Sequence, residues 1–163
     1  MLARDMTLSE QNFLLLLELR SEAETEALGR RIGDALRPGD TVTLAGALGA
    51  GKTLLARAIV RRFLPTEEVP SPTFTLVQTY NTPAFPIWHV DLYRLKTRND
   101  VRELGLDEAL DGGVLIIEWP DRMGELLPRD RLDISFELED DEVERLVKIV
   151  ARGSWVPRID KLK

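Results

Sequence analysis

Gly46-Ala47-Leu48-Gly49-Ala50-Gly51-Lys52-Thr53 is the stretch that decides the fold of this chain. It matches the pattern G-x-x-x-x-G-K-[ST], and its flanks supply the context that this pattern needs. Residues 41–45 before it are β-branched or apolar and predict a strand, whereas residues 54–63 after it are mostly good helix formers. A strand, a glycine-rich loop and a helix in this order predict the phosphate-binding loop of a nucleoside triphosphatase.

The chemistry of the loop follows from its residue types. Its glycines let successive backbone N–H groups converge on an anion, and the following helix adds unpaired N–H groups and the positive end of its dipole. Lys52 is expected to reach the β- and γ-phosphates of a bound nucleotide, and the Thr53 hydroxyl is expected to bind Mg²⁺. The residues expected to bind nucleotide here are Gly46, Leu48, Gly49, Ala50, Gly51, Lys52, Thr53 and Leu54.

The composition narrows the class of protein. A length of 163 residues suggests one domain, and 44% hydrophobic residues allow an ordinary core. The absence of cysteine excludes disulfides, thiolate metal sites and a cysteine nucleophile, and it is compatible with a reducing cytoplasm. No signal sequence is evident, and the apolar run at residues 13–17 is too short to cross a bilayer. A cytoplasmic protein without membrane association is therefore expected.

The charge pattern bears on possible partners. A net charge of −6 argues against autonomous binding of nucleic acid, which usually needs a basic surface. Arg57, Arg61 and Arg62 form a local basic cluster on the helix after the phosphate loop. We interpret this cluster as a solvated helix face, which a protein partner could also meet.

The rest of the chain predicts a strand-rich α/β protein. Strands are expected at residues 13–18, 41–45, 73–80, 87–93 and 114–117, with a hairpin formed by 131–138 and 144–151. Helices are expected from the capping box at Ser21 to about Leu36, after the phosphate loop, and in short pieces over residues 99–110. The adjacent strands at 73–80 and 87–93 suggest a hairpin, so the sheet should be mixed, with parallel and antiparallel pairs.

These elements predict a P-loop NTPase-like fold in which helices flank the mixed sheet as a three-layer α/β/α arrangement. Residues 1–12 are expected to be an N-terminal extension, residues 13–152 the P-loop ATPase domain, and residues 153–163 a C-terminal tail.

Two acidic residues are candidates to complete the site. A phosphate loop needs a carboxylate near its metal, and Glu118 and Asp91 each follow an apolar strand. The residues alone leave open which of them holds the metal and which orients water. Ser71 and Thr73, on a loop stiffened by proline, are candidates to contact the γ-phosphate. His89, the only histidine, is interpreted as structural.

The order and spacing of four segments together resemble the TsaE (YjeE) family of bacterial ATPases. These segments are Gly46–Thr53, Ser71-Pro72-Thr73-Phe74-Thr75-Leu76-Val77, His89-Val90-Asp91-Leu92-Tyr93-Arg94-Leu95 and Ile117-Glu118-Trp119-Pro120. The resemblance covers roughly Ser21 to Ala151. Two departures, Ala47 and Leu54 at positions where the family often has Asp and Thr, leave the phosphate cradle intact.

The resemblance implies a role for each matching residue. Glu118 would join Thr53 as a protein ligand of Mg²⁺, and Asp91 would lie near the γ-phosphate, where it orients water or supports the metal. Lys52, Asp91 and Glu118 are thus the expected catalytic residues. The adenine of ATP would lie toward Glu22, Thr25 and Arg145.

The resemblance also implies partners. ATP hydrolysis in this family supports a separate complex of the TsaB and TsaD proteins, which transfers a threonylcarbamoyl group to adenosine 37 of tRNAs that read codons beginning with A. The chain would meet tRNA indirectly, through that complex.

Other classes of function remain alternatives. A small-molecule kinase would suit the size and the loop, although no second arginine-rich lid follows Asp91. A GTPase switch would commonly carry an Asn-Lys-x-Asp segment, which is absent. A nucleotide-gated binding module would use the same loop without physiological turnover.

Overall fold

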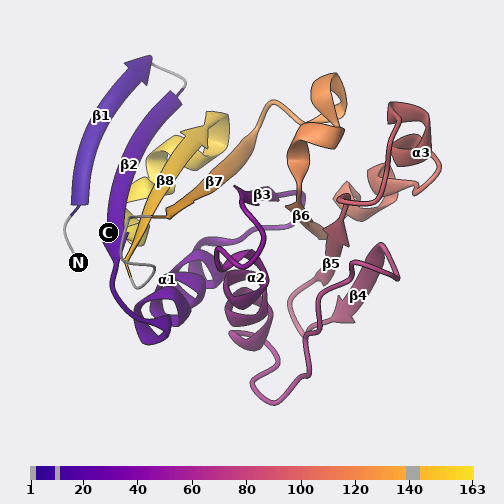
Figure 1. Cartoon of the computed structure of the whole chain (residues 1–163), viewed down its shortest axis with the longest axis horizontal. Helices are drawn as coiled ribbons and strands as arrows, with labels where there is room; N and C mark the ends of the chain where they lie inside the picture. Colours follow the sequence, from indigo (N-terminus) through magenta and orange to yellow (C-terminus); the bar gives the residue numbers. More distant parts are fainter. Residues whose placement is uncertain (1–2, 10–11, 139–143) are drawn as a thin grey trace.

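The computed structural model describes residues 3–9, 12–138 and 144–163, with side chains at the N-terminal strand described only for Ala3 and Arg4. These residues form a single eight-stranded sheet with the order β1-β2-β8-β7-β3-β6-β5-β4 (Figure 1). The strands are β1 (Ala3–Ser9), β2 (Asn12–Leu19), β3 (Thr41–Gly46), β4 (Val77–Asn81), β5 (Pro86–Asp91), β6 (Val114–Glu118), β7 (Arg131–Leu138) and β8 (Arg145–Arg152).

The sheet is mixed, as predicted. The strand β3 lies parallel to both β6 and β7, and β5 lies parallel to β6. The remaining neighbours are antiparallel, including the hairpins β4–β5 and β7–β8. Parallel neighbours bring the carboxyl ends of β3, β5 and β6 to the same edge of the sheet, and the predicted phosphate-binding loop (residues 46–53) leaves β3 at that edge.

Two helices cover one face of the sheet. The helix α1 (Glu22–Ala35) begins at Ser21, whose side chain accepts a hydrogen bond from the backbone N–H of Glu24, and α2 (Lys52–Arg61) follows the phosphate loop. Figure 1 shows these helices side by side. Leu28 of α1 and Ile59 of α2 are fully buried in the larger core cluster, together with the apolar side chains of this sheet face.

Short helices cover the opposite face beside β5 and β6. They are α3 (Arg98–Arg102) and the 3-10 helices η1 (Leu106–Leu110), η2 (Pro120–Arg122) and η3 (Gly124–Leu126). Leu115 and Ile117 of β6 point to this side and pack in a second core cluster with Val101 and Leu106. Helices on both faces confirm the predicted α/β fold class.

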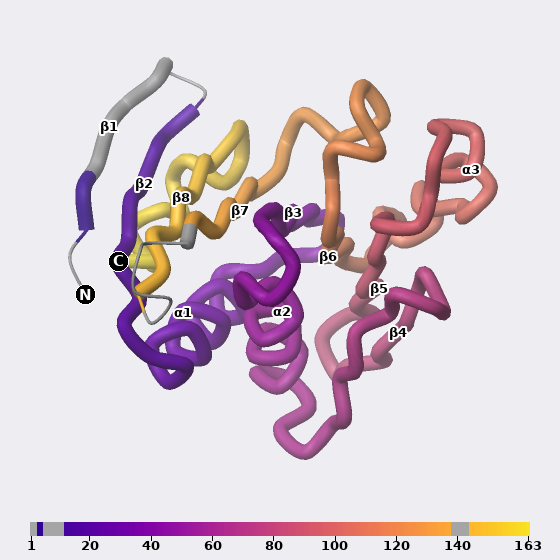
Figure 2. Tube along the Cα trace, in the orientation of Figure 1, coloured from indigo at the N-terminus to yellow at the C-terminus, as the bar shows by residue number. Residues whose placement is uncertain are grey.

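The first and the last described segments of the chain both lie beside β2 (Figure 2). Residues 3–9, within the expected N-terminal extension, form β1 and pair antiparallel with β2. The expected C-terminal tail carries η4 (Gly153–Leu162), whose Trp155, Ile159 and Leu162 are buried in the larger core cluster. No helix in the described part of the chain is long and apolar enough to span a membrane.

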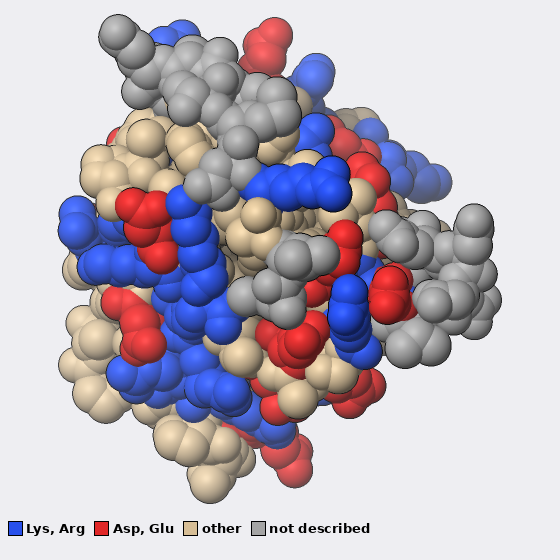
Figure 3. Space-filling view, turned by 90° about the vertical axis from the view of Figure 1, so that its left-hand side faces the viewer, with Lys and Arg blue, Asp and Glu red and all other residues tan. Residues whose placement is uncertain are grey.

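Charge is spread unevenly over this fold. Figure 3 shows lysine and arginine side chains gathered in a band on the side of the molecule that Figure 1 shows at its left, with acidic side chains beside them. The net charge of −6 is a sum over the whole chain and does not show this local clustering of basic side chains.

Candidate functional site

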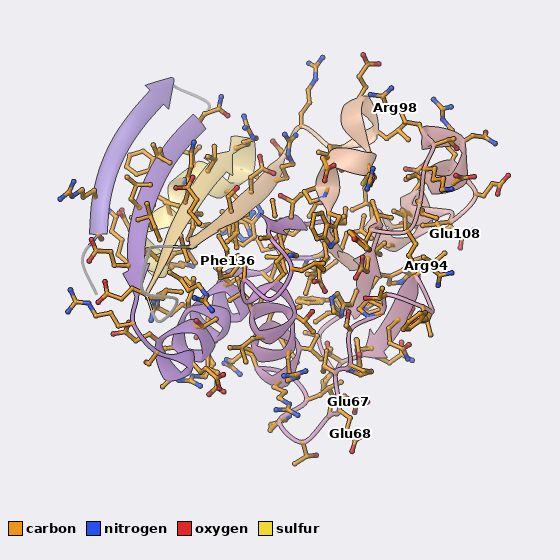
Figure 4. All side chains as sticks on the ribbon, viewed as in Figure 1. Glu67, Glu68, Arg94, Arg98, Glu108 and Phe136 are labelled. Atoms are coloured by element: carbon orange, nitrogen blue, oxygen red, sulfur yellow. The ribbon has the colours of Figure 1, made fainter. Side chains whose placement is uncertain are left out.

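The predicted phosphate-binding loop is shaped by three glycines with a positive φ, since Gly49 has φ +76° in addition to the two glycines at its ends. Gly46 has φ +140° and Gly51 has φ +115°, a backbone conformation that residues with a Cβ rarely adopt. A Cβ on Gly46 would also lie 2.9 Å from the carbonyl oxygen of Phe136, on the adjacent strand β7. Figure 4 marks Phe136 close to the loop. The close approach of β7 therefore excludes larger residues at the start of the loop.

Lys52 lies inside the loop. Its Nζ donates hydrogen bonds to the carbonyl oxygens of Gly46 and Ala47, each at 2.7 Å, and it lies 4.3 Å from the centroid of the Trp119 ring. Burial lowers the pKa of Lys52, and the nearby Glu118 and Asp91 carboxylates act against that shift. The lysine side chain is thus held at the centre of the site, between the loop and two acidic residues.

Glu118 contacts groups from two other elements. Its carboxylate accepts a hydrogen bond from the Thr53 hydroxyl at 3.1 Å and lies 2.6 Å from Nε2 of His89. The three residues belong to different elements: β6 ends at Glu118, α2 contains Thr53, and the neighbouring strand β5 contains His89. The histidine is fully buried, and the carboxylate is nearly so. His89 therefore has a polar contact in the site that its lone place on a strand did not predict.

Asp91 connects the site to the loop before β4. Its Oδ2 accepts a hydrogen bond from the Thr73 hydroxyl at 3.0 Å, and Thr73 shares a second hydrogen bond with the Ser71 hydroxyl at 2.7 Å. Asp91 and Glu118 are register partners at the ends of the parallel strands β5 and β6. The structure thus brings both candidate carboxylates to the phosphate loop and places Ser71 and Thr73 beside one of them.

A cavity of about 560 Å³ joins these groups. The predicted site residues that line it are Glu22, Thr25, Leu48, Gly49, Ala50, Gly51, Lys52, Thr53, Leu54, Ser71, Thr73, Asp91, Glu118 and Arg145. Gly46 is outside this lining, and its carbonyl oxygen instead accepts the hydrogen bond from Lys52.

The end of the cavity toward α1 is formed by residues far apart in sequence. Glu22 and Thr25 come from the first turn of α1, and Arg145 begins β8. The Nε of Arg145 donates a hydrogen bond to the carbonyl oxygen of Ala50 at 3.0 Å. The arginine therefore connects the C-terminal hairpin to the phosphate loop.

Sequence reasoning did not select several residues that line this cavity. Trp119 adopts a left-handed conformation with φ +59°, and its ring lies 4.9 Å from that of Tyr93, measured between centroids. Both rings line the cavity, as do Leu19 and Arg20. A non-glycine residue in this conformation is strained, and such strain gathers at functional sites. The position of Trp119 directly after Glu118 was the available signal.

The residues fit a magnesium ion bound together with a phosphate group. Hydroxyl and carboxylate oxygens suit Mg²⁺, and the closest oxygens of Thr53 and Glu118 are 3.1 Å apart. The described residues contain no cluster of three or more acidic, histidine or cysteine side chains that would enclose a metal alone. Mg²⁺ usually keeps several waters and binds through one or two protein groups plus phosphate oxygens, which matches this sparse set.

Comparison with known proteins identifies the family. The family model of the threonylcarbamoyl adenosine biosynthesis protein TsaE matches residues 19–147. This chain belongs to the TsaE family. The match spans the described site from the start of the cavity at Leu19 to β8.

Individual TsaE proteins agree with this assignment. The tRNA threonylcarbamoyladenosine biosynthesis protein TsaE of Rickettsia felis is 41% identical over 149 residues, covering 91% of this chain and 86% of that protein. Its counterpart in Bacillus subtilis is 38% identical, covering 80% of this chain and 82% of that protein. The crystal structure of Bacillus subtilis YdiB superposes with a TM-score of 0.79 at 31% identity, covering 94% and 97% of the two chains.

Proposed function

We propose that this TsaE-family chain is a Mg²⁺-dependent ATPase that acts as an accessory factor to the TsaB–TsaD complex. The complex would form the threonylcarbamoyl group on adenosine 37 of tRNAs reading codons beginning with A. The observation that carries the ATPase part is the placement of Thr53 and Glu118 within 3.1 Å of each other behind a phosphate-binding loop. Family membership supports the place in tRNA modification.

The proposed roles follow from the position of each group. Backbone N–H groups of the loop and the Lys52 ammonium would hold the β- and γ-phosphates, and Thr53 with Glu118 would hold Mg²⁺. The metal would supply positive charge that neutralises the phosphate oxygens. Asp91, fixed by Thr73 and by the backbone N–H of Tyr93 at 2.9 Å, would orient the attacking water.

Glu22, Thr25 and Arg145 would receive the nucleoside part of ATP. They line the end of the cavity next to α1, and the cavity of about 560 Å³ continues from them to the phosphate loop. Arg145 would also link the bound nucleoside to the phosphate loop, because its side chain donates a hydrogen bond to the carbonyl oxygen of Ala50.

Turnover by the isolated chain should be slow. Among the described residues, the arginines that line the cavity are Arg20 and Arg145. Arg20 forms ion pairs with Glu18 and Glu144 at 3.5 and 3.6 Å, and Arg145 contacts the loop backbone. Because both arginines are already engaged by these contacts, we expect the positive charge that stimulates hydrolysis to come from a partner protein.

Reconstitution tests the proposal. The chain would be added to purified TsaB–TsaD with threonylcarbamoyl-adenylate, tRNA and Mg·ATP, and modified tRNA would be counted per complex. We expect repeated turnover only when both the chain and ATP are present. Lys52→Ala should abolish this stimulation. Full stimulation of tRNA modification without ATP hydrolysis would instead support a nucleotide-gated binding module. An equal rate of repeated modification with and without the chain would contradict the accessory role.

A further inference from the structure

A second cavity lies on the outer side of the two long helices. Its volume is about 240 Å³, and we call it the α1–α2 groove. Its lining consists of Glu26, Arg30, Leu54, Arg57, Ala58, Arg61 and Pro65. Three of these are arginines, whereas Glu26 is the only acidic residue among them. The floor between the charged side chains is apolar, since it is made by Leu54, Ala58 and Pro65.

The arginines of the groove have donor groups available. Arg57 and Arg61 are one turn apart on α2, and each uses its Nε to hold a backbone carbonyl, that of Val69 at 3.1 Å and that of Glu67 at 2.9 Å. Within the described residues, neither these two nor Arg30 forms a salt bridge. Glu67 and Glu68 lie on the loop beyond α2, as Figure 4 shows. The terminal guanidinium nitrogens of Arg57 and Arg61 therefore remain able to bind an anion.

We propose that the α1–α2 groove binds an acidic segment of a partner protein. Guanidinium groups bind carboxylates through paired N–H donors, and arginine is enriched at protein interfaces. The apolar floor would receive an apolar side chain placed between the carboxylates of such a segment.

A nucleic acid fits the groove less well. A phosphate backbone has no apolar side chain for the floor formed by Leu54, Ala58 and Pro65, and Glu26 would repel its charge. The net charge of −6 also opposes a long polyanion, whereas a short peptide senses mainly the charges within about 8 Å, the screening length at physiological salt. The observations therefore favour a protein segment.

The groove is connected to the nucleotide cavity in two ways. Leu54 lines both cavities. Arg57 donates a hydrogen bond to the carbonyl oxygen of Val69, two residues before Ser71, in the loop whose Thr73 contacts Asp91. A segment that binds Arg57 would thus act on the backbone that leads into residues 71–73. This coupling rests on the proposed function, whereas binding in the groove does not.

Fluorescence polarisation tests the binding site directly and without nucleotide. The probe is a fluorescein-labelled peptide of repeated Glu-Glu-Leu triplets, compared with the same peptide carrying Gln for Glu and with a labelled oligouridylate of equal length. We expect the acidic peptide to bind the chain more tightly than either comparison probe. The double variant Arg30→Glu with Arg61→Glu should weaken its binding about tenfold or more.

A charge-matched variant gives the control. Arg102→Glu with Arg129→Glu changes the net charge equally at exposed positions outside the groove, and it should leave peptide affinity within about twofold. Equal losses in both double variants, or equal binding of the Gln peptide, would overturn the proposal. Tighter binding of the oligouridylate that depends on Arg30 and Arg61 would assign the groove to nucleic acid instead.

A second titration separates coupling from the proposed function. A fluorescent ATP analogue is titrated with and without saturating acidic peptide, and the peptide should change its affinity at least twofold in the wild type. The change should be lost in Arg57→Ala. If the analogue does not bind at all, the proposed function fails while the groove stands. If it binds with an affinity that the peptide leaves unchanged, only the coupling is wrong.

Discussion

At the scale of single residues, Glu118 is the point where the site is assembled. Its carboxylate contacts the Thr53 hydroxyl at 3.1 Å and the His89 ring at 2.6 Å, so groups from α2, β5 and β6 meet on one side chain. A carboxylate held by an imidazole ring on one side and a hydroxyl on the other has its position set by the fold. Such fixing by outer groups is what orients metal ligands in general.

Glu118→Gln should separate metal-dependent chemistry from nucleotide binding. The amide keeps the size of the side chain but removes its negative charge, so we expect Mg²⁺-dependent ATP hydrolysis to fall about 100-fold. Affinity for metal-free ATP should change less than about threefold, because the phosphate loop is intact. Steady-state hydrolysis and equilibrium binding measure the two effects. Glu125→Gln, at an exposed position, is the control. Equal losses of binding and hydrolysis would contradict metal ligation by Glu118.

At the scale of secondary structure, α1 and α2 pack unusually closely at a glycine. A Cβ built on Gly29 of α1 would lie 2.4 Å from the Cβ of Ala58 on α2. Helix propensity alone would favour alanine at this position by up to about 1 kcal/mol. The contact with the facing helix therefore decides the sign of the substitution.

We expect Gly29→Ala to lower the free energy of unfolding by about 1–3 kcal/mol, because the helices must move apart in a packed core. Urea unfolding followed by circular dichroism measures it. Removing the facing methyl group restores part of the space, so Gly29→Ala combined with Ala58→Gly should lose less than the sum of the single losses. Additive losses would show that the close contact does not limit the packing. Gly105→Ala, where a new Cβ meets nothing within 4 Å, isolates the cost of a positive φ.

At the scale of the whole molecule, a buried ion pair ties the end of the chain to the start of β3. Arg158 of η4 donates to both carboxylate oxygens of Asp40, at 2.7 and 2.9 Å, and to the carbonyl oxygen of Ala35 at 2.8 Å. The centroid of the Trp155 ring lies 3.9 Å from the guanidinium carbon of Arg158. The last residues are therefore part of the core that positions β3 and its phosphate loop.

Arg158→Met should destabilise the fold strongly. It leaves the buried Asp40 without its partner, and breaking a buried pair costs about 3–5 kcal/mol. Chemical unfolding of Arg158→Met and of the exposed control Lys161→Met gives the comparison. A loss below about 1 kcal/mol for Arg158→Met would mean that the pair does not hold η4 in place.

The face of the sheet opposite α1 and α2 carries a polar cluster that makes stability depend on pH. Burial favours protonation of Asp133, but hydrogen bonds from Thr43, Arg152 and Arg131, with the charge of Arg131, together hold the pKa of Asp133 below its ordinary value of about 3.8. The folded state then binds fewer protons than the unfolded state below that value. The stabilisation is present at neutral pH and is lost as pH falls through the folded pKa.

Asp133→Asn should therefore be less stable than the wild type by about 1–3 kcal/mol at pH 7. The difference should shrink as the pH is lowered below about 4, because the Asp133 carboxylate of the unfolded chain is protonated first, and the stabilisation is lost once the pH falls through the lower pKa of the folded state. Urea unfolding across pH measures it, with Asp121→Asn as an exposed control. A difference that stays constant down to low pH would show that charge at Asp133 is not the cause.

Much of the candidate site could be predicted because its residues belong to motifs and apolar runs that are short in sequence. The phosphate loop, the carboxylates Asp91 and Glu118 at strand ends, and the mixed sheet all follow from short-range spacing and hydrophobic runs. The strand expected to begin at Thr73 instead begins at Val77, after Leu76 with φ +67°. The hydroxyls of Ser71 and Thr73 form hydrogen bonds with each other and with Asp91, and these side-chain bonds compete with strand formation in this segment. The periodicity of apolar residues does not reveal such bonds.

The sequence by itself determined the prediction of a phosphate-binding loop, of its lysine and threonine, and of the acids that accompany them, since these depend on residue type and near spacing. Only the tertiary structure decided the pairing of His89 with Glu118, the closure of the cavity by Arg145, the burial of η4 through Arg158, and the groove formed by Arg30 with Arg57 and Arg61. Each of these joins elements that are distant along the chain. Their meeting is set by strand order and helix packing, which no local pattern contains.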